Sequence, residues 1–255
     1  MARRRKPEKY KFALRPEVAR WLDANDDDDA EADAFFDDWL EEVEDDPRLL
    51  TAGKVKVDPA VLHTRFACVP ERCAPWNERG RMRSCCADIF VPLTPAERRR
   101  LRRHRRLLAG HLLRTEPRLR DCLAKPGREP GDFFLDEDGD ALERVGGRCI
   151  FSRRDAQGRI RCRLYTIAGK LGLETTDIQP YTCRIFPLVL VQLERGRVLL
   201  TVLHKDNYRG LESLPPWRFP CLADPGLPPL HRSMAGTLDW LFGRGFAAWL
   251  ARQAG

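Results

Sequence analysis

The chain has 255 residues and a net charge of +7; 43% of its residues are hydrophobic and 33% are charged. This length fits one large domain or two small ones, and the apolar fraction is sufficient for a real core. The longest apolar run, residues 185–191, is far shorter than the roughly 20 residues of a membrane helix. The basic N-terminus also lacks the apolar segment of a secretory signal. We therefore expect a cytoplasmic protein with no membrane partner.

The first 50 residues form an acidic arm, since they carry sixteen Asp/Glu and only nine Lys/Arg. Within it, apolar positions recur with the period of an amphipathic helix, and these positions are Phe35, Phe36, Trp39, Leu40 and Val43. One interpretation is a surface helix that packs this stripe on the body of the protein. The other is a docking helix for a basic protein partner.

A strongly basic helix is predicted to begin after Thr94. Thr94, Pro95 and Glu97 form a good helix start, with a capping side chain, a proline in the first turn and a capping-box glutamate. Seven arginines follow within residues 97–106, and a buried stripe of Leu101, Leu108 and Leu112 would extend the helix to about Thr115. We interpret the arginines as a solvated face, and binding of nucleic acid is the less favoured alternative.

The remaining elements give an α+β fold class: short antiparallel hairpins, flanking helices and irregular cysteine-rich metal-binding loops. Residues 188–193 and 198–203 predict a hairpin that is buried on both faces, because both arms are nearly continuous Val/Leu runs. A closing helix should run from residue 230 or 233 to 251. We expect three regions: the arm at 1–50, a cysteine-cluster domain at 51–210, and a Pro-rich loop with the closing helix at 211–255.

Cysteine usage is the most informative feature of the sequence. Nine cysteines are present, and in a reducing compartment clustered thiols are more often metal ligands or catalytic groups than disulfides. Two stand apart, Cys122 and Cys221, and we interpret them as structural. The other seven fall into two groups: Cys68, Cys73, Cys85 and Cys86, then Cys149, Cys162 and Cys183.

The second group carries a geometric prediction. Residues 148–152 and 159–163 flank a turn-rich centre, and symmetric pairing would place Cys149 directly opposite Cys162. Directly opposed side chains are close enough for two thiolates to share one ion. Cys183 should lie in an irregular loop stiffened by Pro180 and Pro187. In the first group, the adjacent Cys85 and Cys86 would point to opposite faces of an extended segment.

The ordered motifs over residues 63–193 resemble a known family. Phe-x-Cys, Cys and Cys-Cys are followed by Gly-x-x-Cys-Ile-Phe, Cys-x-Leu-Tyr and Pro-x-x-Cys-Arg-x-Phe-Pro, a pattern similar to the YkgJ-type cysteine-cluster family of zinc- or iron-chelating domains. In longer bacterial relatives a helical insert separates the last two motifs, and residues 164–173 would form it here. The resemblance implies that all seven grouped cysteines bind metal. It departs from the family signature at the eleven-residue spacing between Cys73 and Cys85, against two in the family.

Three functions remain open from the sequence. The preferred one is a metal-binding protein whose cofactor is zinc or iron, with an iron–sulfur cluster as one form, and whose activity beyond chelation is unassigned. The second is an iron–sulfur-dependent enzyme that transfers a group to a protein or peptide. The third is a basic zinc module associated with nucleic acid. All-thiolate coordination suits zinc and iron–sulfur clusters almost equally, so the metal itself stays undecided.

Overall fold

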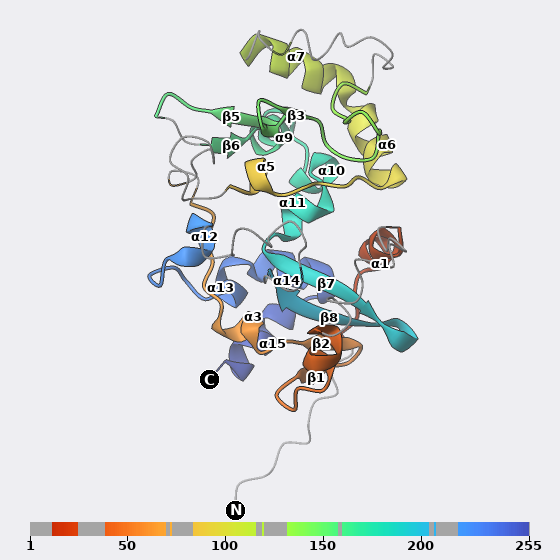
Figure 1. The fold of residues 1–255 in the computed structure, drawn as a ribbon, viewed down its shortest axis with the longest axis vertical. Helices are drawn as coiled ribbons and strands as arrows, with labels where there is room; N and C mark the ends of the chain where they lie inside the picture. Colours follow the sequence, from red (N-terminus) through yellow and green to blue (C-terminus); the bar gives the residue numbers. More distant parts are fainter. Residues whose placement is uncertain are drawn as a thin grey trace, which may run out of the picture. The chain divides into compact units, whose positions relative to one another are not determined.

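The computed structural model describes residues 12–24, 39–69, 72, 84–115, 119, 132–157, 160–203, 207 and 219–254. These residues form helices and small sheets (Figure 1), so the protein is of the α+β class. The chain divides into two compact units. The first unit comprises Met1–Ala67, Pro187–Pro216 and Asp224–Gly255, and the second comprises Cys68–Phe186 and Trp217–Ala223. This division differs from the boundaries at 50 and 210 that the sequence suggested.

A four-stranded sheet organises the first unit. It joins β1 (Leu50–Ala52), β2 (Val55–Val57), β8 (Arg197–Val202) and β7 (Leu188–Leu193), in that spatial order (Figure 1). The outer pairs are antiparallel, whereas β2 and β8 are parallel. The predicted hairpin at 188–203 is therefore confirmed. Its turn places both Arg195 and Gly196 at positive φ, 59° and 65°, a conformation that suits tight hairpins.

The first unit builds its core on both faces of β8, where the adjacent Leu199 and Leu200 are both 0% exposed. Since successive side chains of a strand point to opposite faces, both faces are covered, as the sequence predicted for this arm. One cluster combines residues of β7 and β8 with the helical segment 39–44. Its members are Val191, Leu193 and Leu199, with Trp39, Leu40, Val43, Leu49 and Val189 packed against them.

The acidic arm therefore packs its apolar stripe on the sheet, at least over residues 39–43. This agrees with the first of the two interpretations of the arm. The other two members of the predicted stripe, Phe35 and Phe36, lie outside the described residues.

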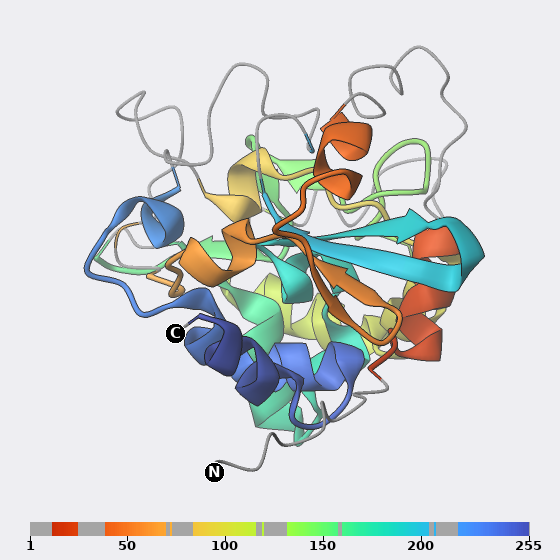
Figure 2. The ribbon, with the colours of Figure 1, turned by 90° about the horizontal axis from the view of Figure 1, so that it is seen from below.

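Five further helices complete the first unit: α1 (Pro16–Asp23), α3 (Ala60–His63), α13 (Leu230–Ser233), α14 (Ala235–Phe242) and α15 (Phe246–Gln253). The single closing helix that the sequence predicted is thus wrong. It is divided into three. Met234, with a φ of −106°, separates α13 from α14, and α14 ends before α15 because Gly243 and Gly245 adopt φ values of 102° and 91°, which a continuing helix cannot accommodate. The chain turns back there, so α14 and α15 pack side by side (Figure 2). Rings at this corner are in contact, with 4.4 Å between the centroids of Phe242 and Phe246.

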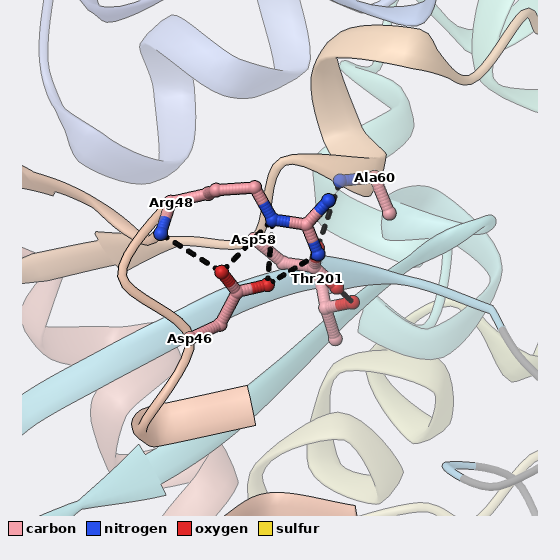
Figure 3. A network of polar contacts seen from close by, with 5 residues as sticks. All are labelled: Asp46, Arg48, Asp58, Ala60 and Thr201. Atoms are coloured by element: carbon pink, nitrogen blue, oxygen red, sulfur yellow. Dashed lines mark hydrogen bonds and ion pairs between the residues drawn. The ribbon is translucent and has the colours of Figure 1, made fainter. Parts of the chain in front are cut away.

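The carboxylate of Asp58 connects the start of α3 to the sheet (Figure 3). Asp58 accepts a hydrogen bond of 2.7 Å from the N–H of Ala60 and another of 2.6 Å from the hydroxyl of Thr201 on β8. The first bond satisfies an N–H at the start of the helix that has no intrahelical partner. Nearby, Arg48 donates to Asp46 at 2.8 Å and holds the pKa of that carboxyl below its usual value.

In the second unit the basic helix appears as predicted, but in two parts. They are α6 (Pro95–Arg103) and α7 (Arg105–Thr115), with His104 between them. The capping box of Thr94 and Glu97 is present, and Leu101, Leu108 and Leu112 are all buried. The helix start and the buried stripe are therefore confirmed.

The other helices of the second unit are short: α5 (Cys85–Asp88), α9 (Arg163–Leu171), α10 (Thr175–Ile178), α11 (Tyr181–Ile185) and α12 (Pro220–Ala223). Helix α9 falls where the helical insert 164–173 was expected. No helix among the described residues is long and apolar enough to cross a membrane.

Two small sheets accompany these helices, and they correct the predicted register around the second cysteine group. β3 (Arg144–Val145) pairs with β4 (Arg148–Cys149), and β5 (Ser152–Arg154) pairs with β6 (Ile160–Cys162). Cys149 lies opposite Arg144, and Cys162 lies opposite Ser152. The predicted Cys149–Cys162 pair is thus wrong, because Gly146 and Gly147 turn the chain one hairpin earlier.

Candidate metal centre

Six of the seven predicted metal ligands lie in the described part of the chain, and all six belong to the second unit. Cys85 and Cys86 are in α5, Cys149 is in β4, Cys162 is in β6 and Cys183 is in α11. Cys68 lies near the end of the described range 39–69. Cys73 lies outside the described residues, as does Cys122. Every described cysteine is a free thiol.

Helix α5 lies against strand β4, which brings the Cys85–Cys86 pair beside Cys149. The guanidinium of Arg144, opposite Cys149 in the β3–β4 pair, donates a hydrogen bond to the carbonyl of Ala87 in α5. The adjacent cysteines are therefore helical, and the expectation of an extended segment with opposed side chains is wrong. Ser84, which precedes them, is buried, and so the start of α5 is anchored inside the unit.

Strand β6 is the third segment that brings a thiol, that of Cys162, to the same place. The chain leaves β4 through Ile150 and Phe151, and the carbonyl of Phe151 accepts a 2.8 Å hydrogen bond from the N–H of Arg163. Residues before β5 and after β6 are thus held together, which keeps Cys149 and Cys162 near one another in spite of the corrected register. The thiol of Cys162 raises the pKa of Cys149, and both thiols raise the pKa of Cys183.

Helix α11 is the fourth segment that contributes a thiol, that of Cys183. The sequence predicted an irregular loop around Cys183, but the structure has a five-residue helix, Tyr181–Ile185, between Pro180 and Phe186. Its first N–H, that of Tyr181, donates a 2.8 Å hydrogen bond to the carboxylate of Glu97. Glu97 is only 1% exposed and also caps α6. One buried carboxylate therefore fixes the basic helix and the helix that carries Cys183.

Burial and mutual repulsion of sulfur atoms keep these thiols protonated. Burial raises the pKa of Cys149 to about 12 and that of Cys162 to about 11, and neighbouring thiols add to both shifts. The pKa of Cys86 is raised first by its hydrogen bond with Cys85 and then by burial. Burial, followed by Cys149 and Cys162, raises the pKa of Cys183. Four elements thus place their sulfur atoms within electrostatic range of each other.

Other groups at the same place favour the thiolate. The cation of Arg144 and the backbone of Phe151 lower the pKa of Cys149. Cys162 immediately precedes α9, and the backbone N–H groups of Leu164 and Tyr165 lower its pKa. N–H groups at a helix start stabilise negative charge. The surroundings can therefore stabilise anionic sulfur once a cation replaces the protons.

We call the six described thiols, Cys68, Cys85, Cys86, Cys149, Cys162 and Cys183, the cysteine cluster. Among the described residues, no group of three or more His, Cys, Asp or Glu side chains is arranged so that it could hold a metal ion as it stands. The donors that do converge are all cysteine sulfur, which is the donor chemistry of zinc and iron–sulfur sites. The chemistry of the donor set therefore fits either group.

Two features of this region were missed in the sequence, and both had a signal. The adjacent Gly146 and Gly147, with φ values of 58° and 75°, are the hallmark of a two-residue hairpin turn, and that turn defines the register of β4. Glu97 was identified as a capping residue, but its second partner, Tyr181, is 84 residues away. No local pattern predicts such a contact.

Comparison with models of known protein families, with curated proteins and with solved structures gave no match to this chain. The resemblance to the cysteine-cluster family accordingly stays a prediction that depends on the motifs in the sequence.

Proposed function

We propose that the protein binds zinc or iron through the cysteine cluster. The observation that carries the proposal is the convergence of thiols from separate segments in one unit. Cysteines used only as small core residues would not need to interact with each other. Here Cys86, Cys149, Cys162 and Cys183, in α5, β4, β6 and α11, each have a pKa that is raised in part by at least one other member.

The raised pKa values of the cluster are consistent with a site for a cation. Partly buried thiols whose pKa values are raised by each other become favourable ligands when a divalent ion neutralises them, and binding then releases protons. Arg144 and the N-terminus of α9 stabilise the remaining negative charge of a thiolate site. Cys68 and Cys85 are exposed, so the cluster is accessible to an incoming ion. When bound, zinc would act as a structural cross-link, whereas an iron–sulfur cluster with an open iron would permit chemistry on a substrate.

The metal content of anaerobically purified protein tests this proposal. We expect about one zinc or a small number of irons per chain, and an absorption band at about 400 nm only in the iron–sulfur case. Cys149→Ser and Cys183→Ser should each lose most of the metal. Cys221→Ser is the matched control, since Cys221 is a buried cysteine of the same unit that stands apart from the grouped cysteines in the sequence. Wild-type protein without metal, or equal loss in all three variants, would overturn the proposal.

A second candidate function, binding of nucleic acid, is favoured by one further observation. The junction of α6 and α7 has a hollow of about 260 Å³ lined by Arg103, His104, Arg105, Arg106 and Leu107. Leu107 is 51% exposed there, so the hollow offers both cations and an apolar surface. Arg103→Glu with Arg106→Glu should abolish binding of an RNA or DNA oligonucleotide that is strong at low salt and weak at high salt. Absence of any binding at low salt excludes this function.

A further inference from the structure

A second cavity lies beside the cysteine cluster. It has a volume of about 220 Å³ and is lined by residues of β3, β4 and β5 with their connections, and by Leu119. Its lining consists of Leu119, Val145, Gly146, Arg148, Cys149, Ile150 and Ser152. A cavity of about 150 Å³ can already hold a benzene molecule. This one is therefore large enough for a small organic ligand.

One side of the cavity is apolar and firmly packed. Leu119 is 3% exposed and Ile150 is 1% exposed, so both belong to the core of the unit. The turn of Gly146 and Gly147 closes the β3–β4 hairpin at the cavity, and both residues adopt positive φ. The turn is short and its conformation favours glycine. It therefore fixes where the backbone of the neighbouring Arg148 lies.

Arg148 gives the cavity its chemical preference. Its Nη1 atom is buried and has no hydrogen-bond partner among the described residues. A guanidinium cannot lose its charge in a protein, and a buried charged donor without a partner is unfavourable. An oxyanion that enters the cavity would accept this hydrogen bond and neutralise the charge, because carboxylates and phosphates match the guanidinium geometry.

We propose that this cavity binds a small molecule with an oxyanion group, held by Arg148, and an apolar part that contacts Leu119 and Ile150. Cys149 lines the same cavity, so the ligand would lie next to the cysteine cluster. That adjacency to a metal rests on the proposed function, whereas anion binding by Arg148 does not. The site would then be more than a structural cross-link: it would place an anionic small molecule beside the metal.

Titration calorimetry with three probes of similar apolar size tests the inference on the full chain. Benzoate and phenyl phosphate carry the two kinds of oxyanion, and benzyl alcohol is their uncharged control. Saturable binding of one or both anions, with no binding of benzyl alcohol, is expected. The preferred anion distinguishes a carboxylate ligand from a phosphate ligand. Failure of both anions to bind wild-type protein overturns the inference.

Arg148→Gln should weaken the anion by about tenfold or more, since a charge-assisted hydrogen bond is lost. The matched control is Lys170→Gln, which removes one charge from an exposed position of α9 in the same unit and should leave affinity unchanged. Val145→Phe, a partly exposed lining residue, should block the cavity while Arg148 is kept. Equal affinity in Arg148→Gln and wild type, or undiminished affinity in a folded Val145→Phe, contradicts the assignment.

Metal content measured on the same samples separates the two proposals. Protein that binds benzoate but carries no metal retains the anion site and refutes the proposed function. Protein that carries metal but binds neither anion refutes only the anion site. Arg148→Gln should keep its metal, since the residue is not a sulfur donor, and loss of metal there would contradict the role of Arg148 in anion binding alone.

Discussion

The two units of the chain differ in how much regular structure they contain. The first unit has a four-stranded sheet whose β7–β8 hairpin has six residues in each strand, and Leu199 and Leu200 on β8 are completely buried. The strands of the second unit have two or three residues each, in separate pairs. Isolated two-stranded pairs are marginally stable in water. The short elements of the second unit nevertheless bring the sulfur atoms of the cysteine cluster near one another.

This difference indicates what the cysteine cluster contributes. Helices α6 and α7 bury a leucine stripe and need no metal to form, but α5, β3, β4, β5, β6 and α11 are each short. Four of these six short elements carry the cysteines described above. A metal would link elements that have little regular structure of their own, whereas the elements of the first unit pack on one four-stranded sheet. The following predictions test this contrast.

Removal of the metal should have the largest effect, and it should be confined to the second unit. Thiolate sites contribute about 10 kcal/mol or more of binding free energy in small domains. We expect hydrogen exchange in the segments of α5, β3–β6 and α11 to increase strongly when a chelator is added. The β7–β8 hairpin of the same sample is the internal control. Equal acceleration in both units would contradict the contrast.

Leu199→Ala should destabilise the first unit and leave the second unit unchanged. Removing a completely buried leucine from the sheet costs about 2–5 kcal/mol, so urea unfolding of the first unit should shift to lower concentration. The metal content should stay unchanged. Leu171→Ala, at an exposed position of α9, is the control and should change stability little. A loss of metal in Leu199→Ala would mean that the two kinds of stabilisation are not separate.

A smaller loss is expected from Asp58→Ala, because this carboxylate satisfies one N–H at the start of α3 and one hydroxyl on β8. The loss should be about 1–2 kcal/mol in urea unfolding. Thr201→Val removes only one of the two contacts and should cost less. Asp46→Ala, in the exposed pair drawn beside it in Figure 3, should cost nothing measurable. An equal cost for Asp46→Ala and Asp58→Ala would contradict the assignment.

The smallest effect concerns pH in the first unit. Burial, and then Arg232, lowers the pKa of His231 below its usual value, so the folded state disfavours the protonated imidazole. The unfolded chain binds that proton below about pH 6.5, and stability is therefore lost as the pH falls through that value. Hydrogen exchange of α13–α15 at about pH 7.5 and about pH 5 should show this loss. His231→Leu should reduce it, and an unchanged slope in that variant refutes the role of His231.

Local signals in the sequence predicted the elements that depend on local chemistry. The capping box at Thr94, the leucine stripe of α6 and α7, and the β7–β8 hairpin were all predictable, because neighbouring residues determine them. The closing helix was predicted too long, since its apolar period continues across Gly243 and Gly245. The positive φ values of these two glycines end the helix there, and the hydrophobic pattern does not reveal this break.

The cysteine region was predictable in composition but not in geometry. The grouping of cysteines indicated which residues converge, but the pairing of Cys149 with Cys162 assumed one symmetric hairpin where the chain forms two. Strands of two or three residues bury too little to fix their register from the sequence alone. Long-range contacts, such as that of Glu97 with Tyr181, decide the outcome.

The parallel pairing of β2 with β8 has a consequence for biosynthesis. Val55 pairs with Val198, so an emerging β1–β2 hairpin waits for its neighbour while the ribosome adds more than a hundred residues. At typical elongation rates this delay lasts roughly 7–30 s. Throughout that time one edge of β2 exposes unsatisfied backbone groups to other chains. Nascent-chain aggregation, or a requirement for a chaperone at the ribosome, is therefore expected to begin at residues 50–57.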